Sequence, residues 1–382
     1  MPQQTPPDPH LIADTPAFEA LVATWRDEPV VGLDTEAASF HRFRDRVYLL
    51  QLSTPDQTVI VDPVGTNGLE PLRPWFDHGN TQFIFHDADY DLRLMHREAG
   101  LRIRSLFDTR VAAQFLNLPG IGLGAILESR FGIKTDKRFQ RADWSARPLT
   151  KEMLTYAATD THYLPDLRIA FRDELLGLGR LSWFEEECEL LTKVEWPAAE
   201  PPELTFFKIK GARDLDRRGL ATLRELHVWR EAIADRLDRA LFRVIGNEAL
   251  VVIATQRPRD IPALERIRGI GAENIARRGA EILQAVERGN AIPEAELPAF
   301  PRHPRYRPDP AFDSRVDRLK AWRTTLAARI DLPPGLVAPN ATLDSVARLA
   351  PTTVAELLAV PGIRRWQVGE FGTELLGLVA KP

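Results

Sequence analysis

Four carboxylates and one phenol stand at spacings that suit metal-assisted chemistry. Asp34 and Glu36 end a short apolar, β-branched run. Alternate residues of a strand point to one face, so these two acids would lie side by side, about 6.5 to 7 Å apart along the backbone. Tyr156 and Asp160 are four residues apart, which puts a phenol and an acid on one face of a helix. Asp91 falls in the first turn of an expected helix, where negative charge is favoured.

Together, these acids fit a site for hard divalent cations. Mg²⁺ and Mn²⁺ prefer carboxylate oxygens and keep open positions for water and a substrate phosphate. Two such ions about 3.5 to 4 Å apart can hold the attacking and leaving oxygens of a phosphoryl transfer. Without cations, four packed acids would repel one another, and their pKa values would rise. Each motif alone is more often a solvated end of a strand or helix, but the three in order predict a metal-dependent site.

The elements that must position these residues follow strand-like and helical patterns. Strands are expected near 30–36, 46–53, 57–62 and 82–86, and helices near 16–26, 88–99, 106–117 and 150–176. Antiparallel strands come first and helix-linked strands follow, which predicts a mixed sheet covered by helices. The acids should gather at one end of that sheet.

Two basic clusters lie near the acidic motifs, at residues 41–46 and 134–141. Lysine and arginine neutralise phosphates, and rings such as Phe40, Phe43 or Trp144 can stack on bases. An ordinary solvated surface is the alternative for any single arginine. The candidate nucleic-acid contacts of this region are Lys137, Arg138, Trp144 and Arg147, of which Lys137, Arg138 and Arg147 are favoured, as a group, only by the family resemblance described below.

Two other features invite functional interpretations that the sequence does not favour. The glycine-rich segment 119–124 has no clear strand before it and lacks the Lys-Ser/Thr pair of a nucleotide-binding loop, so a turn leading into a helix is the better interpretation. His86 could be a metal ligand or a general base. A histidine that closes an apolar strand is more often structural.

From about residue 206, the chain repeats itself with an offset of 93 residues. The matching residues are Trp229-Arg230 with Trp322-Arg323, Asn247 with Asn340, Leu250 with Leu343, Pro258 with Pro351, Gly269-Ile270 with Gly362-Ile363, and Gly279 with Gly372. Both copies have apolar residues at helical spacing separated by short Gly/Pro turns, which predicts two small helical domains.

The motifs resemble those of a known family. Asp34-Thr-Glu36, segment 86–92, segment 144–149 and segment 156–164 are similar to the motifs of the DEDDy 3′–5′ exonucleases, most closely to those of ribonuclease D. The two repeats resemble the HRDC domain, and a tandem pair after a DEDDy domain is the ribonuclease D arrangement. The resemblance implies an α/β ribonuclease H-like exonuclease domain followed by two all-α HRDC-like domains.

The same resemblance implies the chemistry. It makes Asp34, Glu36, Asp91 and Asp160 ligands of two divalent metal ions, Mg²⁺ or Mn²⁺, with Asp34 bridging both. Tyr156 would orient the attacking water or help to deprotonate it. The products would be nucleoside 5′-monophosphates released from an RNA 3′ end.

Domain boundaries are expected at residues 1–200 for the exonuclease domain with its acidic linker, 206–293 for the first HRDC-like domain and 310–382 for the second. In the first copy, Gly269 and Gly271 would expose backbone N–H groups at a helix start, suited to a phosphate of RNA. A tight turn between helices is the alternative. The second copy is less basic on the corresponding face, and the alternative to RNA binding is that it shapes the opening through which RNA reaches the metals.

Composition is consistent with an intracellular enzyme. The net charge is −4, yet residues 206–290 hold 17 basic and 12 acidic residues, an excess that suits RNA. The single cysteine, Cys188, excludes an internal disulfide framework and a cysteine zinc site. Residues 1–9 lack the features of a signal peptide, and no apolar run reaches the roughly 18 residues of a membrane span. The expected location is the cytoplasm.

The leading hypothesis is therefore a Mg²⁺- or Mn²⁺-dependent hydrolytic 3′–5′ exoribonuclease. Its expected partner is RNA, in particular tRNA precursors with 3′ extensions or other small structured RNAs, and a monomer suffices. A related exonuclease that acts on DNA is one alternative. A noncatalytic RNA-binding protein built on an inactive nuclease fold is the other, and the presence of all four acids argues against it.

Overall fold

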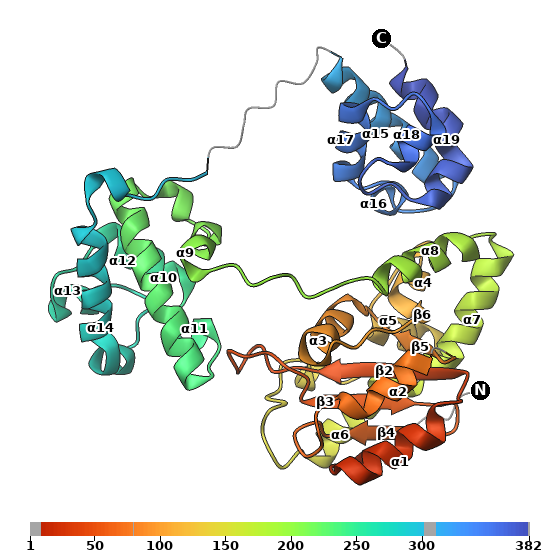
Figure 1. The fold of residues 1–382 in the computed structure, drawn as a ribbon, viewed down its shortest axis with the longest axis horizontal. Coiled ribbons are helices and arrows are strands. Elements are labelled where there is room, and N and C mark those ends of the chain that lie inside the picture. The colour runs from red at the N-terminus through yellow and green to blue at the C-terminus, as the bar shows by residue number, and fades with distance from the viewer. Residues whose placement is uncertain (1–8, 79, 302–310, 381–382) are drawn as a thin grey trace. The chain divides into compact units, whose positions relative to one another are not determined.

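Figure 1 shows the computed structural model, which describes residues 9–78, 80–301 and 311–380. By its internal packing, the chain divides into two compact units. Among the described residues, the first comprises 9–36, 47–78, 80–196 and 311–380, and the second comprises 37–46 and 197–301. The α/β domain thus shares a unit with the second helical repeat, and the ten residues that follow Glu36 belong to the other unit.

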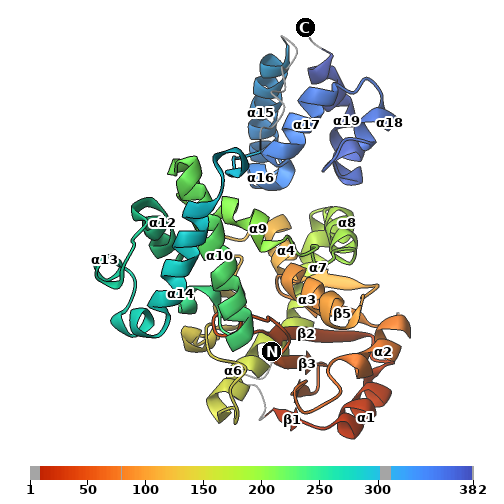
Figure 2. The same cartoon turned by 60° about the vertical axis from the view of Figure 1, so that its left-hand side comes forward.

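A six-stranded mixed sheet forms the centre of the α/β domain, with the strand order β1-β4-β3-β2-β5-β6. The strands are β1 (His10–Ile12), β2 (Val30–Glu36), β3 (Leu49–Ser53), β4 (Thr58–Val61), β5 (Gln82–Phe85) and β6 (Leu106–Asp108). β2, β3 and β4 pair antiparallel, whereas β5 runs parallel to both β2 and β6. β2 lies beside β3 in both views (Figures 1 and 2). The mixed sheet expected from the sequence is confirmed.

Helices pack against this sheet and bury its central strands. They are α1 (Thr15–Trp25), α2 (Arg73–His78), α3 (Asp89–Ala99), α4 (Thr109–Phe115), α5 (Leu123–Phe131), α6 (Lys151–His162), α7 (Leu164–Gly177) and α8 (Leu181–Leu191), with a 3₁₀ turn, η2 (Lys137–Phe139). Val31 and Leu33 of β2 are fully buried. The strand is therefore apolar along most of its length, as expected when neither face meets water.

Three expectations about these elements need correction. The helix expected over 150–176 is two helices, because Pro165 in the first turn of α7 cannot continue the hydrogen bonding of α6. The helix expected over 106–117 begins with strand β6, and α4 starts only after Asp108, whose side chain caps it by accepting the N–H groups of Arg110 and Val111. The short edge strand β1 was not expected, since three residues carry too little periodicity.

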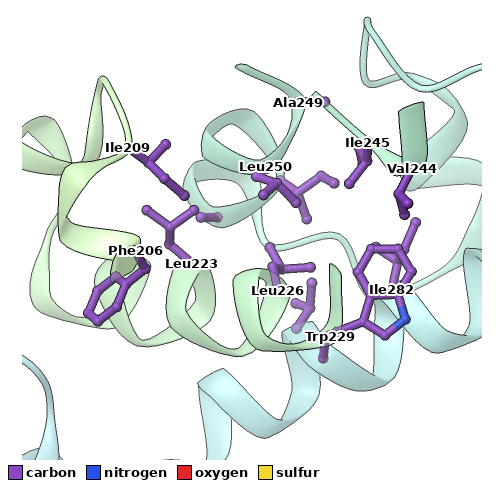
Figure 3. Packing of buried hydrophobic residues seen from close by; sticks show 14 of the residues in the cluster. Phe206, Ile209, Leu223, Leu226, Trp229, Val244, Ile245, Ala249, Leu250 and Ile282 are labelled. Carbon is purple, nitrogen blue, oxygen red and sulfur yellow. The ribbon is translucent and has the colours of Figure 1, made fainter. Parts of the chain in front are cut away.

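The second unit contains the first helical copy. Its helices are α9 (Pro202–Thr205), α10 (Arg217–Leu237), α11 (Leu241–Val244), α12 (Asn247–Gln256), α13 (Ile261–Glu265) and α14 (Ala272–Ala291). Leu223, Leu226 and Trp229 of α10 face Leu250 and Ile282 in its core (Figure 3). Apolar residues spaced three and four apart put one face of α10 into this core.

Residues 37–46 are part of the second unit through specific contacts with α10 and the turn after it. The backbone N–H groups of Phe43 and Arg44 donate to the Asp238 carboxylate at 3.2 and 3.0 Å. Arg44 Nε also donates to Asp235 at 2.9 Å. The Phe43 ring is partly buried and packs against the core of this unit.

The second helical copy lies in the first unit and repeats the first copy in detail. Its helices are α15 (Phe312–Arg329), α16 (Pro334–Val337), α17 (Asn340–Leu349), α18 (Val354–Leu358) and α19 (Arg365–Val379). The last four begin 93 residues after α11, α12, α13 and α14.

The repeat extends to individual hydrogen bonds. Trp229 Nε1 donates to Glu281 at 2.8 Å, and Trp322 Nε1 donates to Glu374 at 2.7 Å. The same offset relates the Arg230–Asn247 and Arg323–Asn340 hydrogen bonds, at 2.7 and 2.8 Å. In the part of the chain that the structure describes, no helix is both long and apolar enough to cross a membrane.

Gly32 permits the close approach of β2 to the junction of α6 and α7. A Cβ atom there would lie 2.9 Å from the Thr161 carbonyl oxygen and 3.3 Å from Leu164 Cβ.

We expect Gly32→Ala to destabilise the α/β domain by about 1–3 kcal/mol, because neither the strand nor the helix can move freely to make room for the added methyl group. It should also lower activity, since β2 carries Asp34. The midpoint of urea unfolding measures the first effect. Gly177→Ala, where the added Cβ meets nothing within 4 Å, is the control, and equal midpoints for the two variants would contradict the packing argument.

Candidate active site

Three of the expected acids meet at the end of β2. One carboxylate oxygen each from Asp34, Glu36 and Asp160 lies within 4.8 Å of the others. Asp34 and Glu36 project from the same face of β2, as their spacing predicts, and Asp160 projects from α6. Three carboxylates at this separation form a set of hard oxygen ligands that fits a divalent cation.

Asp91 stands beside this group rather than within it. It lies in the first turn of α3, is 7% exposed, and accepts a hydrogen bond from the Thr35 hydroxyl. Thr35 sits between the two acids of β2, so its side chain points to the opposite face of the strand. The end of β2 therefore contacts Asp91 through Thr35, and Asp91 is also near enough to Asp34 for the charge of one to act on the other.

Asp108 fixes the loop that delivers Asp91. This buried carboxylate accepts the backbone N–H groups of Asp87 at 3.1 Å and Ala88 at 2.7 Å, in addition to capping α4. Asp87 has a φ of 73°, a left-handed conformation that aspartate tolerates better than most residues. Because Asp108 satisfies several backbone donors at once, the turn between β5 and α3 has a fixed path.

The electrostatics of the acids reflect their burial and their mutual repulsion. Burial raises the pKa of Asp34 well above its ordinary value, and the charge of Asp160 raises it further. Burial likewise raises the pKa values of Glu36 and Asp91, with Asp34 adding to both. Burial raises the pKa of Asp160 to about 7, although the hydrogen bond from Tyr156 opposes the shift. A divalent cation would relieve this repulsion, so the residues present fit a metal site.

Tyr156 is positioned by aromatic packing on two sides. Its ring stacks on Trp144 with centroids 6.1 Å apart, and it meets Phe139 at 5.7 Å. Burial raises the pKa of Tyr156 above its ordinary value, and the charges of Asp160 and Glu36 raise it further. The phenol is therefore protonated at neutral pH and donates to Asp160.

Asp34, Glu36 and Asp160 line a pocket of about 490 Å³ together with His86 and the start of α5. This volume is within the usual range for small-molecule sites. Gly122 begins α5, so segment 119–124 is a turn leading into a helix, as expected. His86 Nδ1 lies 3.0 Å from the Thr109 hydroxyl, and burial followed by the charge of Arg110 lowers its pKa to about 4. The imidazole is neutral at pH 7.

A second pocket, of about 460 Å³, lies on the Tyr156 and Asp160 side of α6 and collects part of the basic segment 134–141. Arg138 lines it and pairs with Asp136. Lys137 begins η2, but its side chain lies outside the described part of the chain. Only Arg138 of this pair can be placed beside the active site.

Trp144 and Arg147 occupy structural positions. Trp144 is 1% exposed, so the expectation that it stacks on a base is not met, because Tyr156 and the surrounding core cover its ring. Arg147 donates from Nε and a terminal nitrogen to Asp62 at 2.6 and 2.7 Å and to the Tyr48 carbonyl at 2.9 Å. This guanidinium ties the segment before α6 to the sheet, a role that the sequence did not indicate.

The two glycines proposed for RNA contact lie just before α14. Gly269 has a φ of 92°, where a side chain would be strained, and Gly271 caps the helix without a side-chain hydrogen bond.

Comparisons with known proteins agree with this geometry. A family model described as a 3′–5′ exonuclease matches residues 9–176, and the HRDC domain model matches residues 219–286 and 312–379. The chain is similar to ribonuclease D of Gluconacetobacter diazotrophicus, with 33% identity over 97% of this chain and 93% of the relative. Ribonuclease D of Granulibacter bethesdensis is 31% identical over the same shares.

The fold also resembles a solved structure. The crystal structure of RNase D from Escherichia coli, described as an exoribonuclease involved in structured RNA processing, aligns with a TM-score of 0.70 and 24% identity. The alignment covers 98% of this chain and 99% of that one. The α/β exonuclease fold followed by helical HRDC domains is therefore confirmed.

The raised pKa of Asp160 predicts how pH affects the metal-free protein. Between about pH 4 and pH 7, the folded chain holds a proton on Asp160 that the unfolded chain has lost, so stability falls as pH rises through this window. Asp160→Asn removes the charge. In chelator at pH 8, we expect its melting temperature to exceed that of the wild type by several degrees, at about 2–4 °C per kcal/mol. The gain should shrink at pH 5. Melting curves of both proteins from pH 5 to pH 8, with the exposed Asp173→Asn as control, make the test, and a pH-independent difference would count against the repulsion.

Proposed function

The chain belongs to the ribonuclease D family, and we propose that it trims 3′ extensions from tRNA precursors or other small structured RNAs. Its activity is that of a 3′–5′ exoribonuclease, which the relatives of near-full length and the exonuclease match support over the alternatives. The observation that carries the assignment in the structure is the meeting of Asp34, Glu36 and Asp160 at the end of β2.

The family is metal-dependent, and we infer that two Mg²⁺ or Mn²⁺ ions bind here. Asp34, Glu36, Asp160 and Asp91 would hold them, with Thr35 orienting the Asp91 carboxylate through its hydroxyl. When bound, such ions neutralise the scissile phosphate and make water a better nucleophile at neutral pH. Without them, the raised pKa values of the four acids disfavour the charged forms that ligation requires.

Tyr156 would orient the attacking water rather than remove its proton. Its pKa is raised, so the phenolate that could act as a base is disfavoured at neutral pH. The phenol Oη–H donates to Asp160, and its oxygen can accept a hydrogen bond from water. The rings of Trp144 and Phe139 hold the phenol in place. A fixed phenol would orient the attacking water in one direction.

Contacts to the RNA body would come from basic residues outside the acidic group. Lys137 and Arg138 belong to the basic segment beside Tyr156, and the first helical copy carries a basic excess. Gly269 and Gly271 offer backbone N–H groups before α14. The proposed domains are residues 1–200, 206–293 and 310–382, and a monomer supplies every residue of the proposed site. Action on structured RNA is supported by the description of the E. coli enzyme.

Asp34→Asn tests the assignment most directly. We expect it to reduce cleavage by at least about 10²–10³-fold, because the loss of charge removes the central ligand that stabilises the transition state. RNA binding should change little. The measurement uses a 5′-labelled tRNA precursor with a short 3′ extension, incubated with Mg²⁺, Mn²⁺ or chelator.

A metal-dependent ladder that shortens from the 3′ end in the wild type alone is the expected result. Turnover by the variant at the wild-type rate would refute the ligand assignment. A DNA strand of the same sequence is run in parallel, since an enzyme that senses the 2′-hydroxyl cuts the RNA faster. Failure to halt near the mature tRNA end would reject the proposed substrate while leaving the nuclease activity intact.

Tyr156→Phe keeps the ring packing and removes only the hydroxyl. We expect hydrolysis to slow by up to about 10²-fold, because the attacking water would no longer be oriented by the hydroxyl. The metal concentration for half-maximal activity should not change. Tyr163→Phe is the matched control, because Tyr163 is buried and its hydroxyl has no hydrogen-bond partner among the described residues. Single-turnover rates on a short RNA compare the two. Equal rates for wild type and Tyr156→Phe would remove the phenol from the mechanism.

A further inference from the structure

The starts of α14 and α19 are built on the same scaffold. Asn274 Nδ2 donates to the Val244 carbonyl at 2.6 Å, and Gln367 Nε2 donates to the Val337 carbonyl at 2.7 Å. Both partners of the second bond lie 93 residues after those of the first. Gly269 and Gly362 precede the helices with φ values of 92° and 83°. The backbone path into the helix is therefore the same in the two copies.

The residues at the helix start itself differ completely. The first copy has Gly271-Ala272-Glu273, and the second has Arg364-Arg365-Trp366 at the corresponding positions. Two small residues and a carboxylate in the first copy thus correspond to two guanidinium groups and an indole in the second. Because the surrounding scaffold is unchanged, the replacement points to a specific contact made by the second copy.

That contact is with helix α8 of the α/β domain. The backbone N–H groups of Arg365 and Trp366 donate to the two carboxylate oxygens of Glu186, at 2.7 and 2.9 Å. Glu186 is only 9% exposed. The first N–H groups of a helix have no partner within it and carry partial positive charge, so they bind anions. A buried carboxylate that takes two of them fills this anion site.

The side chains of the same three residues complete the contact. Arg364 Nε donates to Glu187 at 2.7 Å, and Arg365 pairs with Glu189. The Trp366 ring stacks on Trp183 with centroids 4.7 Å apart and an interplanar angle of 17°. Each of the residues that distinguish the second copy therefore has a partner on α8.

We infer that the second helical copy is a docking module whose helix start is reserved for the α/β domain and closed to RNA. Glu186 occupies the position where a phosphate of a nucleic acid would meet the helix N–H groups. The acidic residues of α8 thus serve as an internal substitute for the nucleic-acid backbone. This inference concerns the second copy alone and stands whatever RNA the enzyme trims.

Amide hydrogen exchange of the full-length protein tests the docking. We expect the amides of Arg365 and Trp366 to be protected in the wild type and to exchange about 10- to 100-fold faster in Glu186→Ala, as for the loss of hydrogen bonds to a charged group. Glu185→Ala, an exposed neighbour on α8, should leave both amides protected. Unchanged exchange in Glu186→Ala would overturn the inference.

A charge swap tests the side-chain contact. Glu187→Arg and Arg364→Glu should each speed exchange at these amides, and the double variant should restore protection, because the pair is re-formed with opposite charges. All variants should degrade a short single-stranded RNA at the wild-type rate, which shows that the active site is folded. A double variant no better protected than the single variants would reject the pairing.

A third experiment tests whether RNA can reach the start of α19. A 20-nucleotide RNA is added to the wild type in chelator, so that it is not cleaved. Protection at Arg365 and Trp366 should stay as it was, because Glu186 holds the site. If RNA alters the exchange of these two amides, the helix start is accessible to nucleic acid, and the inference fails.

Discussion

Repulsion among carboxylates is the constraint that organises the α/β domain. One carboxylate oxygen each of Asp34, Glu36 and Asp160 lies within 4.8 Å of the others, and burial raises the cost of their negative charges further. Folding does not favour such a cluster by itself. The surrounding structure must therefore impose it. β2 does so from the middle of the sheet, where paired strands on both sides leave it little freedom to move.

Several polar residues that take no direct part in catalysis maintain this arrangement. Thr35 holds Asp91, Asp108 holds the turn before α3, and Arg147 holds the segment before α6 through Asp62. Each is a buried or half-buried polar group with its hydrogen bonds satisfied, so it specifies one geometry rather than several. The acids are thus positioned from three directions, and the rings of Trp144 and Phe139 do the same for Tyr156.

The sequence predicted the acids and the phenol of the site better than the residues that position them. The placing of Asp34 beside Glu36 and of Tyr156 beside Asp160 follows directly from strand and helix geometry. The 93-residue offset identified the two copies, and the structure adds that they share paired hydrogen bonds. Contacts between residues far apart in the sequence leave no repeating pattern from which they could be predicted. The pairing of Arg147 with Asp62 spans 85 residues, and only the lone acid that ends the apolar β4 run could have hinted at it. The burial of Trp144 likewise depends on tertiary packing, which residue type does not reveal.

Residues 37–46 belong to a different compact unit from β2, which affects how truncated forms of this enzyme should be interpreted. The segment 37–46 leaves β2 directly after Glu36, yet its packing partners, Asp235 and Asp238, belong to the first helical copy. A fragment that ends before that copy would lack the partners of the ten residues that follow Glu36. If such a fragment lost activity, the cause could be a change at the end of β2 as well as the loss of contacts with RNA. Point substitutions on the surface of the first helical copy leave its contacts with residues 37–46 in place, so they test the proposed role of this copy in RNA binding more cleanly than a truncation does.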